Sequence, residues 1–114
     1  MYRYIKKEGN EITNKFVEST NKKELLEIFT KTLYPFKVSK SVIKLNLEHA
    51  LHGFQQEMRG ASFHSFIKSS PKEMRQVFYQ ILIKHFIISI NSDKDLVENK
   101  NFGRITNEIE NLLN

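Results

Sequence analysis

Residues 70–90 read SPKEMRQVFYQILIKHFIISI, and this stretch decides the fold class. Its first residues have the pattern of a capping box, with Ser70 at the N-cap, Pro71 in the first turn and Glu73 at the third helical position. Apolar side chains then recur at helical spacing and become nearly continuous. The stretch therefore predicts a helix that is apolar on almost every side and lies at the centre of the molecule. Because five of the ten residues 81–90 are isoleucine, a β-strand is the alternative interpretation.

Two further helices are predicted before this stretch and one after it. Apolar residues at helical spacing run from Leu25 to Leu33, and Pro35 ends that helix because the residue before a proline is pushed out of the α region. A second amphipathic stretch starts at the N-cap residue Ser39 and stops at Gly60 after about five turns. The last predicted helix carries its apolar residues on one face: Ile105, Ile109, Leu112 and Leu113.

The segments between these helices are less regular. Residues 91–103 predict a polar loop with one short helical turn at Lys94–Glu98. Residues 61–67 are too apolar for a free loop, so we expect them to pack over the helices or to form a short helix. Residues 2–17 predict either a β-hairpin or an arm that ends in a helix. The expected fold is one all-α domain over residues 1–114, a compact bundle or array of four to five helices in which residues 1–20 form an N-terminal arm or hairpin and residues 21–114 the helical body.

Composition narrows the class of protein. With 114 residues, the chain has room for one hydrophobic core. The absence of cysteine excludes disulfides and thiolate metal sites. The chain shows no signal-peptide pattern, and its longest apolar stretch is too short to span a bilayer, so we expect a cytoplasmic protein without membrane association.

The positive charge is concentrated in the middle of the chain. The net charge is +5, and residues 31–90 carry nine basic and three acidic side chains. Such an excess suits a polyanionic partner. Lysines outnumber arginines fourteen to four, which favours nonspecific attraction to phosphates over sequence-specific reading of bases.

Residues 21–51 resemble the second half of a helix-turn-helix motif. In that motif, small polar and basic residues at the start of the recognition helix reach into the major groove. The resemblance implies that Ser39, Lys40, Ser41 and Lys44 face DNA. It also implies that Val42, Ile43 and Leu47 face the body of the protein. The turn here is longer than the usual three or four residues. The alternative is an ordinary helix N-terminus with a solvated basic face.

Two patterns raise the question of catalysis or metal binding. Arg59 followed by His64 is similar to the Arg-x4–6-His signature of HEPN-type helical ribonucleases, and this resemblance implies a pair that polarises a scissile phosphate. The alternative is a helix-terminal arginine and a loop histidine. His49 and His52 lie three residues apart on one predicted helix, with Glu48 beside them. Zinc needs three or four converging ligands, so we expect a solvated pair, no metal and no cofactor.

The sequence therefore favours a binding protein over an enzyme, with two classes open and a HEPN-like ribonuclease as a third, weaker reading. The first class is a nucleic-acid-binding regulator, and the second is a protein-interaction module such as an adaptor, an inhibitor or an assembly subunit, in which self-association is also open. An interaction module predicts an exposed apolar surface. The candidate nucleic-acid contacts form two basic clusters, which nucleic-acid binding would require on one face: the first is Lys37, Ser39, Lys40, Ser41 and Lys44, and the second is Lys68, Lys72 and Arg75. The candidate protein contacts are Phe63, Phe66 and Tyr79.

Overall fold

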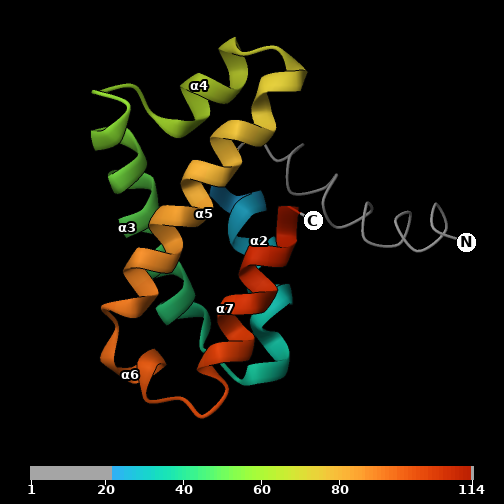
Figure 1. Cartoon of the computed structure of the whole chain (residues 1–114), viewed down its shortest axis with the longest axis vertical. Coiled ribbons are helices and arrows are strands. Elements are labelled where there is room, and N and C mark those ends of the chain that lie inside the picture. The colour runs from blue at the N-terminus through green and yellow to red at the C-terminus, as the bar shows by residue number, and fades with distance from the viewer. Residues whose placement is uncertain (1–21, 114) are drawn as a thin grey trace, which may run out of the picture.

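The computed structural model describes residues 22–113, and this part of the chain is entirely helical between its turns (Figure 1). The all-α prediction is confirmed. The predicted number of four to five helices is too low, because two connecting segments each form a short α-helix of their own. The N-terminal hairpin or arm was predicted for residues outside the described range. Residues 22–113 contain six α-helices: α2 (Lys22–Leu33), α3 (Lys40–Glu57), α4 (Phe63–Ser69), α5 (Arg75–Asn91), α6 (Lys94–Val97) and α7 (Phe102–Glu110).

Helix α5 is the central element, as its apolar sequence predicts. It packs antiparallel to α3 along most of its length and also contacts α4, α6 and α7. The residues of the alternative strand, 81–90, lie inside this helix. Among the described helices, none combines the length and the apolar character needed to cross a membrane.

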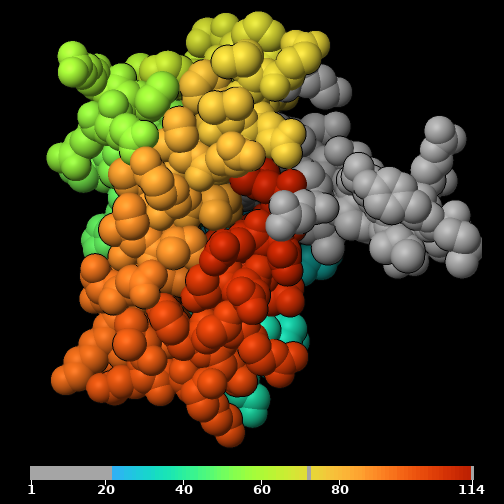
Figure 2. Space-filling view, viewed as in Figure 1, coloured from blue at the N-terminus to red at the C-terminus, as the bar shows by residue number. Residues whose placement is uncertain are grey.

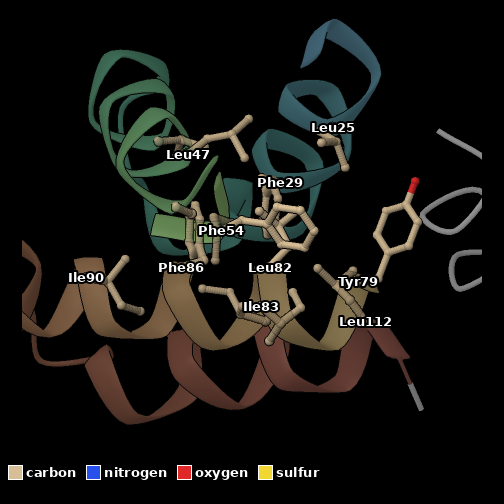
Figure 3. Packing of buried hydrophobic residues seen from close by; sticks show 14 of the residues in the cluster. Leu25, Phe29, Leu47, Phe54, Tyr79, Leu82, Ile83, Phe86, Ile90 and Leu112 are labelled. Carbon is tan, nitrogen blue, oxygen red and sulfur yellow. The ribbon is translucent and has the colours of Figure 1, made fainter. Parts of the chain in front are cut away.

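The hydrophobic core forms where α2 and α3 meet α5 (Figure 3). Phe29 of α2 stacks on Phe86 of α5 with 4.4 Å between ring centroids. Phe54 of α3 makes an edge-to-face contact with Phe63 of α4, with 5.0 Å between ring centroids. Helix α7 covers another side of α5 and also packs against α2. These contacts fix the orientation of α2 and α3, and so they fix the turn that joins the two helices.

The helix ends follow the sequence prediction at α3 but not at α5. The Ser39 hydroxyl accepts a hydrogen bond from the backbone N–H of Val42, as an N-cap does. Gly60 follows the helix with a φ of 107°, a conformation that glycine adopts without strain. The predicted capping box at Ser70 is wrong, because that hydroxyl donates to the Phe66 carbonyl at the end of α4. A 3-10 turn, η2 (Lys72–Met74), precedes α5 instead.

Candidate nucleic-acid interface

The chain reverses direction between α2 and α3 through a short 3-10 helix, η1 (Tyr34–Phe36). Pro35 occupies the first turn of η1, where its fixed φ suits a helical start. Lys37 then adopts the left-handed conformation, with a φ of 59°, and its N–H donates to the Tyr34 carbonyl at 3.1 Å. Ser39 caps α3 two residues later. We call the residues that this turn presents, Lys31, Tyr34, Lys37, Lys40 and Lys44, the basic corner.

The side chain of Tyr34 projects into solvent at the basic corner. Its exposed fraction is 79%, the highest among the large apolar side chains that are exposed. Helical periodicity does not bury it, because α2 ends one residue earlier and the backbone changes direction there. Phe36 lies on the same turn, and the guanidinium of Arg104 from α7 lies 5.7 Å from the centroid of its ring. The turn therefore exposes the Tyr34 ring and holds a cation from α7 against the Phe36 ring.

The lysines of the basic corner are exposed and make no ion pairs with the described residues. The sequence explains this, since no acidic residue lies between Glu27 and Glu48 while four lysines do. Two lysines outside the corner do form ion pairs. Lys22 Nζ lies 2.8 Å from Glu48 Oε1, and Lys84 Nζ lies 2.6 Å from Glu57 Oε1. The hydrogen bond from Lys22 lowers the pKa of Glu48, and the charge of Lys44 acts in the same direction.

A shallow hollow of about 370 Å³ lies against the exposed ring, between the second half of α2 and the start of α3. Lys31 and Lys40 line it together with Tyr34, Thr30 and Glu27. The Thr30 hydroxyl is buried and has no hydrogen-bond partner among residues 22–113. Its oxygen atom is shielded from solvent, so the groups that the hollow presents to a ligand are the two lysines, the tyrosine ring and the Glu27 carboxylate.

The structure places the two predicted basic clusters at opposite ends of the molecule (Figure 1). Lys37, Ser39, Lys40, Ser41 and Lys44 lie at the start of α3, and all five are exposed. The second cluster lies where α4 meets α5, at the far end of the α3–α5 pair. In Figure 2 this junction forms one end of the molecule, and the α2–α3 turn emerges beside α7 toward the other end. The clusters therefore do not form one continuous surface. Of the second cluster, Lys68 is exposed, Arg75 is half-buried and Lys72 begins η2.

The expectation that Phe63, Phe66 and Tyr79 form an exposed apolar surface is wrong. Phe63 and Tyr79 are fully buried, with 5.0 Å between their ring centroids in an edge-to-face contact. Phe66 is half-buried, and the centroid of its ring lies 5.3 Å from that of Phe78. The physical reason is that α4 folds back onto α5, so its aromatic face completes the core.

A groove of about 640 Å³ lies between α3 and α5. At one end, buried Asn46 donates to the Val42 carbonyl at 2.9 Å and to Asp93 Oδ2 at 3.0 Å. The Ser89 hydroxyl donates to Asn46 Oδ1 at 2.6 Å. His49 Nδ1 lies 3.5 Å from that hydroxyl. This hydrogen-bond network engages the polar atoms of the groove within the protein itself.

The other end of the groove is closed by His85. Its Nε2 lies 2.7 Å from Glu57 Oε1, which also accepts from Lys84. These hydrogen bonds, that from Lys84 foremost, lower the pKa of Glu57. A Cβ on Gly53 would come within 2.6 Å of His85 Nδ1, so glycine is needed for α3 to approach this ring. The interaction holds α3 and α5 in register.

Two further histidine patterns from the sequence concern the Arg59–His64 pair and a possible metal site. Arg59 is exposed beyond the end of α3, with a φ of 61°. His64 lines a separate hollow that His52 shares and Arg59 does not. Within residues 22–113, no three histidine or carboxylate side chains lie close enough together to hold a metal ion.

Comparisons with known proteins assign no function. No protein-family model, no curated protein and no solved structure matches the chain. The function is therefore inferred from the arrangement of residues described above. Sequence reasoning identified most of the lysines of the basic corner but missed Lys31 and Tyr34. The signal that points to them is an aromatic residue before proline, within a lysine-containing stretch that lacks acidic residues.

Proposed function

We propose that this protein binds nucleic acid through the basic corner. The observation that carries the proposal is the group of four exposed lysines around Tyr34, none of which is neutralised by an ion pair within the described residues. Each lysine that approaches a phosphate releases a condensed counterion, and this release drives sequence-independent binding. A regulator of the helix-turn-helix kind would use the same surface.

The distribution of charge along α3 favours contact at the start of the helix rather than along its length. Lys40 and Lys44 occupy the first two turns, and Glu48 follows on the next turn. Farther along, the helix buries Ala50 and Phe54 against its neighbours and ends at Glu57. A polyanion is therefore attracted to the corner and not to the second half of α3.

The test is fluorescence anisotropy of labelled oligonucleotides at about 50 and about 200 mM salt. We expect wild-type affinity to fall steeply between these concentrations. The double variant Lys40→Glu and Lys44→Glu is expected to weaken binding about tenfold or more, because each reversal turns an attraction into a repulsion. The control is Lys23→Glu with Arg59→Glu, which changes net charge equally at exposed positions away from the corner.

The outcomes separate three interpretations. Loss of binding in the Lys40/Lys44 variant alone supports the basic corner. Equal losses in both double variants would indicate attraction to overall charge and contradict a localised interface. Absence of wild-type binding at low salt would contradict nucleic-acid binding altogether.

The second candidate function is protein interaction through the rim of the α3–α5 groove. Leu45 and Ile88 flank this groove and are 52% and 54% exposed, which favours an apolar partner such as an amphipathic helix. Substitution of both residues by serine is expected to abolish such an interaction and leave oligonucleotide binding unchanged. A protein partner that still binds this variant would contradict the groove as its docking surface.

A further inference from the structure

We infer that Tyr34 is a stacking platform for unpaired bases, so that the preferred ligand of the basic corner is single-stranded nucleic acid. This inference rests on the proposed function and specifies its ligand class. The ring is 79% exposed, and no contact in the described structure covers it. Base–aromatic stacking contributes about 1–3 kcal/mol per base and tolerates any sequence, because every base has a π face.

The surroundings of the ring fit a nucleotide. Lys31 and Lys40 share the hollow with Tyr34, so cations stand beside the ring where the phosphates of a stacked nucleotide would lie. Glu27 also lines the hollow, and its carboxylate can accept from an exocyclic amino group but repels phosphate.

The selection for single strands follows from where base faces are accessible. In a duplex, each base is stacked between its neighbours, and its faces are closed to an external ring. An unpaired base presents a free face, as in proteins that combine a basic groove with aromatic rings. The lysines attract both forms of nucleic acid through phosphate, and the Tyr34 ring adds affinity only for unpaired bases.

The experiment compares the wild type with Tyr34→Ala and Tyr34→Phe. The probes are a single-stranded DNA and a single-stranded RNA of about 16 nucleotides, a blunt-ended duplex without a loop, and the same DNA strand with abasic sites. We expect Tyr34→Ala to weaken single-strand binding about tenfold, while Tyr34→Phe keeps most of the affinity. Binding of the blunt-ended duplex and the slope of affinity against salt are expected to stay unchanged, because the phosphate contacts remain.

The abasic strand supplies the decisive control. Removal of the bases is expected to weaken wild-type binding by about the same factor as Tyr34→Ala and to have little further effect in that variant. The loss of affinity on Tyr34→Ala is expected for both the DNA strand and the RNA strand. The strand that the wild type binds more tightly identifies the preferred sugar. Equal single-strand binding by wild type and Tyr34→Ala would overturn the inference, and the proposed function would still stand if the Lys40/Lys44 variant lost binding. No oligonucleotide binding by the wild type would overturn both.

Discussion

The basic corner and the α3–α5 groove both present polar groups to solvent, but they use these groups differently. In the groove, Asn46 bonds to Ser89 and Asp93, and Glu57 accepts from Lys84 and lies within 2.7 Å of His85. In the corner, the lysines and Tyr34 have no such partners in the described residues. Groups that are satisfied internally stabilise the fold, whereas groups left without partners are available to a ligand. Substitutions in the groove should therefore affect unfolding, and those in the corner should affect binding.

The largest expected effect is at Asn46, the one buried polar side chain among the described residues. Asn46→Leu keeps the approximate volume but removes a donor to Asp93 Oδ2 and the acceptor of the Ser89 hydroxyl, so we expect a loss of about 2 kcal/mol in the free energy of unfolding. Urea denaturation measures this loss. The control is Lys44→Leu on the exposed side of the same helix, which is expected to stay within about 0.5 kcal/mol of wild type. Similar effects at the two positions would contradict the distinction between groove and corner.

The second-largest effect on the free energy of unfolding is expected at Gly53, where α3 approaches His85. Gly53→Ala gains helix propensity, but the added Cβ would lie 2.6 Å from His85 Nδ1 and displace the ring from Glu57. We expect a net loss of about 1 kcal/mol, since the strain of overpacking exceeds the gain. In a His85→Ala background the ring is absent, and the same substitution should stabilise the protein. A loss of equal size in both backgrounds would show that His85 is not the cause.

The ion pairs of Glu57 predict a pH dependence of smaller size. Its carboxyl pKa is lowered from an ordinary value of 4.5, chiefly by the hydrogen bond from Lys84 and then by that from His85. A lowered acid pKa contributes stability above the ordinary value and loses it as pH falls through the folded value. We therefore expect Glu57→Gln to lower Tm at neutral pH and to approach wild type in acid below 4.5. Glu98→Gln, at an exposed position without an ion pair in the described residues, should show no such convergence.

The smallest effects are expected when Lys37 or Lys44 is replaced by glycine, which separates the contribution of backbone conformation from that of charge within the basic corner. Lys37 has a φ of 59°, where a side chain is unfavourable, so Lys37→Gly should leave the free energy of unfolding unchanged or raise it by about 0.5 kcal/mol. The same substitution at helical Lys44 should lower it by about 1 kcal/mol. Both variants lose one corner charge and should weaken oligonucleotide binding by similar factors. Equal stability losses would contradict the left-handed conformation of Lys37.

The sequence predicted the helices with strong periodicity, but not the contacts that join them. The start of α3 followed from Ser39, and the position of α6 followed from its short helical pattern. The capping box failed because local pattern does not reveal that α4 ends at Ser69, where the Ser70 hydroxyl can bond to the preceding turn. Periodicity also does not distinguish aromatic rings of the core from exposed ones.

The candidate site was predicted in part. Lys37, Lys40 and Lys44 are exposed as expected, because they lie on the polar side of a capped helix and its approach. Whether the second cluster joins them depends on how α3 and α5 pack, and the antiparallel arrangement separates the two. The exposure of Tyr34 depends on the exit angle of α2, which helical periodicity does not give, although an aromatic residue before proline marks the position.

The fixed backbone of the corner has a consequence for binding kinetics. Pro35 restricts η1, and the Lys37 N–H closes the turn on the Tyr34 carbonyl, so the backbone that carries the ring is held in place before a ligand arrives. Little backbone conformational entropy is then lost on association. We expect the lysines to set the association rate by long-range steering, and the ring to set the dissociation rate through short-range contact. Charge reversal at Lys40 and Lys44 should therefore slow arrival, whereas Tyr34→Ala should shorten the lifetime of the complex.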